Sequence, residues 1–414
     1  MGDAVQRLIQ ADDLTGAADT AVAFAAAGER TVVVPWAAGD LGARLDRIVG
    51  ALEPQCLAVD TGSRDGERAD AARRAGALAG WLSPGRGRSI YKKVDSVLRG
   101  HPGAELAAVL DALDGPRPVV VAPAYPALGR TTAGARQLVD GTPLAGGDLI
   151  GVLELDPQRT RVVSVGELRG GLSIGREDAF VVVDAELPGD LDRLADALEQ
   201  LGAPPLLVGS GGLAAAIAAR GGEPAVVEQA QDRPDGRRLV VSVSRTTTAT
   251  AQVGRLLELM PELCDARLEL AAVTGDEPAR RAAVERSAAL VRAALAAGGD
   301  ALLGVRGEAA GRGDVRRRIN RSLEQVVARA LAAERPELVV VSGGDSALSI
   351  CSALAVDALV VERALPEGAV ESTTHGHPDA PLRLVTKSGG FGGPDALAEL
   401  CGAQRREPAG SGGR

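Results

Sequence analysis

Short, continuous runs of apolar and β-branched residues alternate with longer Ala-, Leu- and Arg-rich stretches of helical period through most of the 414-residue chain. Because these runs carry no polar alternation, they predict strands buried on both faces, as in parallel sheets covered by helices. The expected strands are residues 31–35, 56–59, 119–122, 180–183, 206–208, 239–243, 301–305, 338–341 and 382–386, and the main expected helices are residues 16–27, 64–81, 190–201, 277–297 and 315–333. The pattern predicts an α/β protein with parallel or mixed sheets flanked by helices.

One polar stretch divides this pattern in two. Residues 221–238 are rich in Gly, Glu, Gln, Asp and Pro, and they separate two series of strand–helix units. We therefore expect a first domain at residues 1–222, a linker at residues 223–238 and a second domain at residues 239–403. Residues 404–414 are polar and Gly-rich, which predicts a disordered tail.

The composition excludes several classes of function. The formal net charge of −9 comes without a stripe of basic residues, which argues against a nucleic-acid partner. The four Cys residues lie far apart and form no C-x-x-C pair, so neither a zinc site nor a disulfide framework is indicated. No apolar run approaches the roughly 18 residues of a membrane span. The charged pair Asp12-Asp13 comes too early for a signal peptide, so we expect a cytoplasmic protein without a membrane partner.

Lysine is rare in this chain, and the positions of the few lysines are informative. Of the 46 Lys and Arg residues, only Lys92, Lys93 and Lys387 are Lys. A compact ammonium group on a flexible stem fits places where a planar guanidinium does not. All three lie beside Gly- or Asp-rich loops of the kind that bind anions, which favours a functional role over chance survival at surface positions.

Two adjacent carboxylates, Asp12 and Asp13, follow the first expected strand, and Thr15 then opens a helix. One carboxylate could act as a general base on a substrate hydroxyl or hold a metal ion. Helix capping by Asp13 or Thr15 is the alternative. Because a single cap does not need two Asp residues, we favour a catalytic role.

The loop that follows residue 91 is the richest in functional groups. Alternation along a strand sends Lys93 and Asp95 to one face and Lys92 to the other. Together with Ser96 and Arg99, Lys93 and Asp95 suit a polyhydroxy acid, because cations bind its carboxylate while Asp and Ser bind its hydroxyls. A surface cluster of ion pairs is the alternative interpretation.

Two further arginines follow expected strands. Arg64 comes shortly after the strand at residues 56–59 and would point into the same region, although a solvated helix Arg is equally plausible. Arg130 follows a proline-stiffened turn and fits a second clamp on an anion. As a single motif, this turn is a weak signal.

In the second half, three expected strands end in loops rich in Gly, Ser and Thr. Ser244 opens one loop, residues 343–346 form the second with the sequence Gly-Gly-Asp-Ser, and residues 387–390 form the third with Lys-Ser-Gly-Gly. Hydroxyls, backbone N–H groups and paired glycines before a helix suit a phosphate. The third loop is not a Walker A motif, because its Lys precedes the glycines. We expect a cradle for a polyphosphate.

A fourth loop admits another interpretation. Residues 209–214 fit G-x-G-x-x-A after a strand, and Glu228 lies 19 positions after Gly209. This is the dinucleotide fingerprint, which makes an NAD-dependent oxidoreductase an alternative function.

Read in order, the motifs at residues 11–16, 92–100, 129–132, 209–213, 343–347 and 387–392 resemble the four-carbon acid sugar kinase family. Members of that family phosphorylate threonate, erythronate or oxo-tetronates with ATP. The resemblance implies an N-terminal sugar-acid domain, a C-terminal nucleotide domain and an active site in the cleft between them. It also implies that the loop at residues 209–214 is structural. The expected cofactors are ATP and Mg²⁺, with no metal ligand assigned, and the expected partners are the sugar acid, ATP and a second copy of the chain.

The expected site has three parts. The catalytic candidates are Asp12, Asp13 and Asp95; the substrate-binding candidates are Arg64, Lys92, Lys93, Ser96, Arg99, Gly100 and Arg130; the nucleotide-binding candidates are Ser244, Gly343, Gly344, Asp345, Ser346, Lys387, Ser388, Gly389 and Gly390.

The chain departs from the family pattern at three places in its second half. Val243 stands where the family usually has Gly, Ser346 stands where Thr is more frequent, and residues 366–376 lack the usual Pro-Gly-Val-Pro pattern. These departures motivate a further alternative, a degenerate protein that binds a sugar acid and a nucleotide without turnover.

Overall fold

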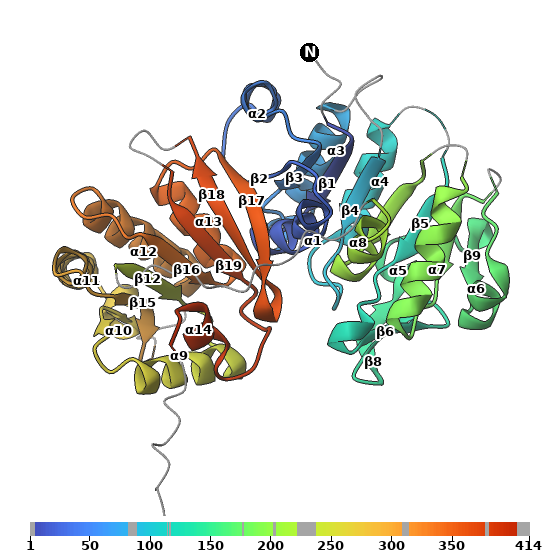
Figure 1. Ribbon diagram of the computed structural model, residues 1–414. Coiled ribbons are helices and arrows are strands. Elements are labelled where there is room, and N and C mark those ends of the chain that lie inside the picture. Colours follow the sequence, from blue (N-terminus) through green and yellow to red (C-terminus); the bar gives the residue numbers. More distant parts are fainter. Residues whose placement is uncertain are drawn as a thin grey trace, which may run out of the picture. The chain divides into compact units, whose positions relative to one another are not determined.

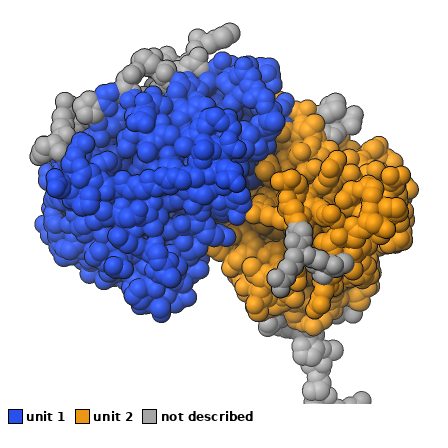
Figure 2. All heavy atoms as spheres, turned by 180° about the vertical axis from the view of Figure 1, so that it is seen from behind, with its two compact units in different colours: residues 1–227, 357–363 blue, residues 228–356, 364–414 orange. Residues whose placement is uncertain are grey.

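The computed structural model describes residues 5–81, 89–113, 115, 117–175, 178–201, 204–221, 237–308, 314–376 and 381–403. The chain divides into two compact units, one of residues 1–227 and 357–363 and the other of residues 228–356 and 364–414 (Figure 2). The expected linker lies outside the described residues except for Arg237 and Arg238. The expected tail at residues 404–414 lies outside them entirely.

The first unit is built on a mixed sheet whose strand order is β17-β2-β3-β1-β4-β11-β5-β10-β9 (Figure 1). Neighbouring strands are parallel except for β17, which runs antiparallel to β2. The strands are β1 (Arg7–Ala11), β2 (Thr31–Val34), β3 (Cys56–Asp60), β4 (Ser89–Lys93), β5 (Val119–Ala122), β9 (Thr160–Val163), β10 (Phe180–Val183), β11 (Leu206–Gly209) and β17 (Ala358–Leu365).

Helices cover both faces of this sheet, with α1 and α8 on one face and α3 and α4 on the other (Figure 1). The helices are α1 (Leu14–Ala26), α2 (Leu41–Leu52), α3 (Arg68–Trp81), α4 (Pro102–Ala112), α5 (Leu149–Val152), α6 (Val165–Gly171), α7 (Pro188–Glu199) and α8 (Gly211–Ala218), with 3₁₀ turns η1 (Pro126–Leu128) and η2 (Pro157–Arg159). A separate antiparallel sheet consists of β6 (Arg130–Ala133), β7 (Arg136–Val139) and β8 (Thr142–Asp148).

The second unit has a smaller sheet of order β13-β15-β12-β16-β19-β18, with β14 also paired to β15. Its strands are parallel except for the antiparallel pair β18 and β19. The strands are β12 (Arg238–Ser242), β13 (Cys264–Asp265), β14 (Leu268–Glu269), β15 (Ala301–Arg306), β16 (Leu338–Ser342), β18 (Ala369–His375) and β19 (Arg383–Lys387). The helices are α9 (Thr247–Leu259), α10 (Leu270–Thr274), α11 (Glu277–Ala296), α12 (Val315–Leu331), α13 (Gly344–Ala353) and α14 (Ala396–Leu400), with the 3₁₀ turn η3 (Pro366–Gly368).

The prediction of an α/β fold with mixed sheets is confirmed, because each expected strand coincides with an observed strand to within one or two residues. The continuous apolar runs are buried on both faces: every residue of β3 and of β5 is buried. The pattern of apolar runs predicts no strand at β8 or β18, because Thr142–Asp148 and Ala369–His375 mix polar and small residues and carry no long apolar run.

Strand β17 is the part of the fold whose position in space differs most from its position in the sequence. It lies late in the sequence, yet Leu359 pairs with Val33 and Val360 with Val32 in the sheet of the first unit. Ala358 belongs to the hydrophobic core of that unit. The second domain is therefore not the uninterrupted segment at residues 239–403 that the sequence suggested, because residues 357–363 belong to the first unit.

A buried arginine of α2 ties this returning segment to the first unit. Arg44 is 8% exposed, and its guanidinium donates to the carbonyl oxygens of Pro35 and Asp357, each at 2.7 Å. It also lies 3.7 Å from the carboxylate of Asp357. The side chain thus joins the end of β2 to the residue that precedes β17.

We predict that Arg44→Met lowers the free energy of unfolding by about 1–3 kcal/mol, because buried carbonyl groups lose their donor. Urea unfolding followed by circular dichroism measures this. The matched control is Arg47→Met on the exposed face of the same helix, where the guanidinium donates to Ala43 O. Equal losses in the two variants would show that Arg44 does not anchor the segment.

Candidate functional site

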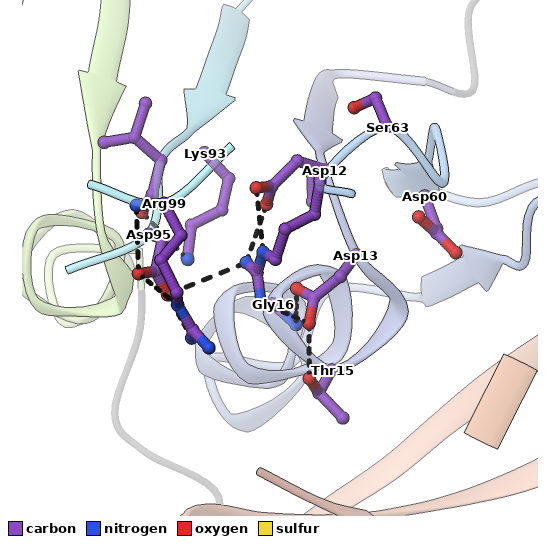
Figure 3. Close-up of polar contacts among 12 residues, drawn as sticks. Asp12, Asp13, Thr15, Gly16, Asp60, Ser63, Lys93, Asp95 and Arg99 are labelled. Carbon is purple, nitrogen blue, oxygen red and sulfur yellow. Dashed lines mark hydrogen bonds and ion pairs between the residues drawn. The ribbon is translucent and has the colours of Figure 1, made fainter. Parts of the chain in front are cut away.

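The carboxyl ends of β1, β3 and β4 lie side by side, because these parallel strands are neighbours in the sheet. Ala11 pairs with Asp60 of β3, and Gln10 pairs with Lys92 of β4. The loops that follow the three strands therefore reach the same edge, where ligands bind in open parallel sheets. Figure 3 shows Asp12, Asp13, Lys93, Asp95 and Arg99 gathered there.

Arg64 is the centre of this group. Its Nε and Nη2 donate to the two carboxylate oxygens of Asp12 at 2.9 and 2.7 Å, and its Nη1 donates to Oδ2 of Asp13 at 2.5 Å. Nη2 also lies 3.7 Å from Oδ1 of Asp95. Burial alone would lower the pKa of Arg64, but the attraction of Asp12 and Asp13 raises it. The side chain is only 12% exposed, so Arg64 is a part of the group and not a solvated helix residue.

Asp12 and Asp13 differ in their surroundings. Asp13 is the N-cap of α1: its Oδ1 accepts from Gly16 N at 2.9 Å and its Oδ2 accepts from Thr15 Oγ1 at 2.8 Å. Burial raises the pKa of Asp13 in spite of Arg64. Burial also acts on Asp12, but there the bidentate contact with Arg64 outweighs it and lowers the pKa. Capping therefore explains Asp13 and leaves Asp12 for another role.

Asp95 organises the loop after β4. Its two carboxylate oxygens accept from Nε and Nη2 of Arg99 at 2.9 and 2.8 Å, and Oδ2 also accepts from the backbone N–H groups of Val97 and Arg99. Burial favours the neutral acid, yet the hydrogen bonds from Arg99 and the charge of Arg64 lower the pKa of Asp95. The carboxylate is thus fully engaged within its own loop.

Gly100 is required at the end of this loop. Its φ is +89°, and a Cβ atom there would lie 2.8 Å from Oδ2 of Asp12. Only a glycine allows both the positive φ and this close approach to Asp12. The residue therefore shapes the site through its backbone.

Lys93 and Lys92 point to opposite faces of β4, as strand alternation predicts. Lys93 is 4% exposed, and its Nζ donates to Val94 O at 2.9 Å. A Cβ on Gly16 would lie 3.4 Å from the ammonium and 2.5 Å from Oδ1 of Asp13, so a glycine lets the start of α1 pack closely against both side chains. Among the described residues Lys93 forms no ion pair, which leaves ammonium protons for a ligand.

Lys92 belongs to a different, fully buried group. Its Nζ lies 2.6 Å from Oε2 of Glu105, and both side chains are 1% exposed. Oε1 of Glu105 accepts from Ser63 Oγ, which in turn shares a 2.8 Å hydrogen bond with Thr61 Oγ1. The structure thus places Lys92 in a structural ion pair beneath the strand ends, away from the face that carries Lys93.

Ser96 and Arg130 are not joined to the Arg64 group by hydrogen bonds or ion pairs within the described residues. Ser96 O accepts from Nε2 of Gln137 at 2.9 Å, which fastens the small β6-β7-β8 sheet to the loop after β4. Arg130 donates to Leu128 O and lies 3.9 Å from Oδ1 of Asp140. Its observed contacts are therefore within that small sheet and the η1 turn.

In the second unit, three strand ends meet in the same way. Ser242, Ser342 and Lys387 stand in register across β12, β16 and β19. The loops beyond them converge, since a Cβ on Gly389 would lie 3.3 Å from Ser244 Oγ and 3.8 Å from the Cα of Gly343. The structure thus brings together the three loops that the sequence singled out.

Helix α13 starts at this convergence. Gly343 is its N-cap, with a φ of +105°, and its N–H donates to Lys387 O at 2.8 Å. The hydroxyl of Ser346 is buried without a hydrogen-bond partner among the described residues, whereas Asp345 pairs with Arg316. A free helix N-terminus with a buried, unpartnered hydroxyl suits an anion.

Lys387 is 1% exposed and holds the third loop together. Its Nζ donates to Ser388 O at 2.8 Å and to Phe391 O at 2.6 Å. Burial lowers the pKa of Lys387 to about 8, although the carboxylate of Glu367 acts in the opposite direction. The lysine thus closes the turn that presents Gly389 and Gly390.

Sequence reasoning missed three acidic residues near the first site. Glu105 is the partner of Lys92, and Asp60 accepts from Gly62 N at 2.6 Å at the end of β3. Burial raises the pKa of Asp60 to about 7. Asp19 lies one turn after Gly16 on α1, so both residues lie on the same face of the helix. This spacing was the only feature of the sequence that placed Asp19 near the site.

The G-x-G-x-x-A loop has a packing explanation. A Cβ on Gly209 would lie 2.4 Å from Tyr91 Oη, and a Cβ on Gly212 would lie 2.6 Å from Ala124 O. These glycines are needed for close contacts within the first unit, which removes the reason to invoke a dinucleotide. Glu228, the proposed ribose carboxylate, lies outside the described residues.

No three His, Cys, Asp or Glu side chains in the described ranges are grouped so as to hold a metal ion. No helix in that part of the chain is both long and apolar enough to cross a membrane.

Comparison with known proteins identifies both halves. Residues 7–149 match the model of a sugar-binding N-terminal domain, and residues 239–397 match that of a nucleotide-binding C-terminal domain. A D-threonate kinase of Cupriavidus necator is 34% identical over 94% of this chain and 96% of its own length. A D-threonate kinase of Bordetella bronchiseptica is 33% identical over 96% of this chain and 97% of its own length.

A solved structure supports the fold. A Haemophilus influenzae protein of the DUF1537 family superposes with a TM-score of 0.67 at 20% identity, covering 95% of this chain and 99% of its own. At that identity the match shows the shared fold alone. The two domain matches, together with 34% identity to a D-threonate kinase over 94% of this chain, show that the chain belongs to the four-carbon acid sugar kinase family.

Proposed function

We propose that the chain transfers the γ-phosphoryl group of ATP to the terminal hydroxyl of a four-carbon sugar acid. The observation that carries the proposal is the cluster at the ends of β1, β3 and β4, where Arg64 holds Asp12 and Asp13 while Lys93 keeps unpaired ammonium protons. Both kinases compared above act on D-threonate by name, which puts this acid first among threonate, erythronate and the oxo-tetronates.

The charges of the first site suit such an acid. Lys93 is a buried cation without a carboxylate partner among the described residues, so a substrate carboxylate would complete it. Arg99, whose side chain is 59% exposed, adds positive charge at the rim. Asp12 and the hydroxyl of Ser96 are candidates for contacts with the substrate hydroxyls. Arg130 remains a candidate that would have to leave its present contacts.

The second site suits the phosphates of ATP. Backbone N–H groups at the start of α13, the hydroxyls of Ser244 and Ser346, and the open backbone at Gly389 are donors for phosphate oxygens. Mg²⁺ would enter with ATP and neutralise charge on its phosphates. The part left to the chain is to position both substrates and to stabilise the charge that develops during transfer.

The departure at Val243 does not favour a degenerate protein. Val243 is not among the described non-glycine residues with a positive φ, so its loop has a backbone conformation that valine adopts without strain. Residues 366–376 form η3 and β18 and end in a glycine turn. We therefore prefer the active kinase.

The proposal predicts that ADP is released from ATP and Mg²⁺ when D-threonate is added. A coupled ADP assay with D- and L-threonate, D- and L-erythronate and 3-oxo-tetronate as acceptors measures this. Five-carbon sugar acids serve as controls. Binding of an acid in calorimetry without any acid-dependent ADP release would instead support the non-catalytic alternative.

We predict that Asp12→Asn lowers activity, whereas Asp13→Ala lowers stability. Asp12→Asn should lose at least about tenfold in kcat/KM with the sugar acid, because Arg64 loses its ionised bidentate partner. Asp13→Ala should lose about 1 kcal/mol of stability, because α1 loses its cap.

The control is Asp13→Asn, since Asn caps helices as well as Asp does and should melt like the wild type. Steady-state kinetics and thermal melts of the three variants provide the comparison. If Asp12→Asn alters only the melting temperature, Asp12 has no part in the site.

We predict that Lys387→Met raises KM for ATP and leaves binding of the sugar acid unchanged. It should also remove a pH dependence of stability. The pKa of Lys387 is about 8 in the folded protein against an ordinary value of 10.5. Between these two pH values the unfolded chain binds the extra proton, so stability of the wild type should rise with pH relative to the variant.

Thermal melts of both proteins across this pH range test the second point, and calorimetry with each ligand tests the first. A parallel pH profile for the two proteins would show that Lys387 is not held as a buried amine.

A further inference from the structure

The acidic residues around the first site are not equally free to bind a ligand. Both oxygens of Asp12 accept from Arg64, and both oxygens of Asp95 accept from Arg99. The oxygens of Asp13 are taken by Gly16 N, Thr15 Oγ1 and Arg64. A carboxylate whose charge is already compensated by a guanidinium is a weaker acceptor for a substrate hydroxyl than a carboxylate without such a partner.

Asp19 is the exception in this group. It is partly buried, and among the described residues its carboxylate accepts no hydrogen bond and forms no ion pair. A Cβ on Gly211 would lie 2.7 Å from Oδ2 of Asp19 and 2.9 Å from Cε1 of Tyr125. The glycine that starts α8 therefore lets that backbone pack closely against this carboxylate without covering it with a side chain.

Asp19 and Lys93 lie close enough to interact but too far apart to pair. The charge of Lys93 acts on Asp19, yet the two form no ion pair within 4.0 Å. The direction of α1 explains why Asp19 lies near Lys93. Side chains of a helix lean toward its N-terminus, and Asp19 follows Gly16, the residue beside Lys93, by one turn. A charge removed from water without a partner in direct contact costs free energy, and a ligand that contacts both Lys93 and Asp19 would recover part of that cost.

The groups that face Asp19 from the surrounding elements are Lys93 and Tyr91 of β4, Asp13 before α1, and Tyr125 after β5. Burial raises the pKa of Asp19 to about 6, against the attraction of Lys93 and with the repulsion of Asp13. The carboxylate is therefore ionised at neutral pH and becomes protonated in mildly acidic solution.

We propose that Asp19 is a specificity-determining contact that accepts a hydrogen bond from the 2-hydroxyl of the sugar acid whose carboxylate Lys93 binds. In a 2-hydroxy acid the carboxylate and the hydroxyl are on adjacent carbons, so one such ligand can place its carboxylate at Lys93 and its 2-hydroxyl at a nearby acceptor. This inference rests on the proposed function. It assigns to Asp19 the choice of 2-hydroxy acids over analogues that lack the hydroxyl.

The test compares Asp19→Ala and Asp19→Asn with the wild type on D-threonate and on its 2-deoxy analogue. We expect Asp19→Ala to weaken binding of D-threonate about 10- to 100-fold, the range for a hydrogen bond to a charged group. Binding of the 2-deoxy analogue and KM for ATP should stay unchanged. Affinity of the wild type for D-threonate should fall below a pH of about 6, and Asp19→Asn should lack this fall.

Calorimetry gives the affinities, so the result does not depend on turnover. Asp111→Asn, an exposed acid on α4, is the control for loss of a charge in the same unit. Equal weakening of D-threonate and of the 2-deoxy analogue would overturn the inference, as would an unchanged affinity for D-threonate in Asp19→Ala. Acid binding by a wild type that releases no ADP would overturn the proposed kinase activity alone.

Discussion

The first unit depends on one cation, the guanidinium of Arg64, which bridges carboxylates that follow β1 and β4 from its own place after β3. Buried charges cost free energy unless they are paired, and the geometry here meets that condition with a bidentate contact to Asp12 and a further contact to Asp13. Removing Arg64 would leave several carboxylates facing one another in a poorly hydrated place. The strand ends are thus held together by the same charges that form the site.

This pairing also decides which groups remain for a ligand. Arg64 and Arg99 make the direct contacts with Asp12, Asp13 and Asp95, so within the described residues neither Lys93 nor Asp19 has an oppositely charged side chain at ion-pair distance. In such a site, a ligand that lacks either complementary group leaves a buried charge without a partner. This cost in free energy lowers its affinity relative to a ligand that carries both groups. The second unit uses a different principle, since its donors are backbone N–H groups and hydroxyls.

The sequence predicted those parts of the molecule that local rules control. Continuous apolar runs located the parallel strands, and the residues after them located both candidate sites, because carboxyl ends of parallel strands share an edge. Local rules cannot reveal that residues 357–363 return to pair with β2, since that pairing joins segments over three hundred positions apart. Nor could they show that Lys92 pairs with Glu105 while Lys93 has no carboxylate at ion-pair distance among the described residues, because this depends on side chains from other elements.

The scarcity of lysine gains a physical meaning in the structure. Lys92, Lys93 and Lys387 are 1%, 4% and 1% exposed, so chance survival at surface positions does not explain them. Each donates to a main-chain carbonyl of the next residue, at distances of 2.8–3.0 Å. An ammonium group can do this within the narrow space at a strand end and still keep protons for a second partner, whereas a planar guanidinium needs a wider fork of acceptors. The second partners then differ: Glu105 for Lys92 and Phe391 O for Lys387, whereas Lys93 has no second partner among the described residues and is the one that we propose binds the substrate.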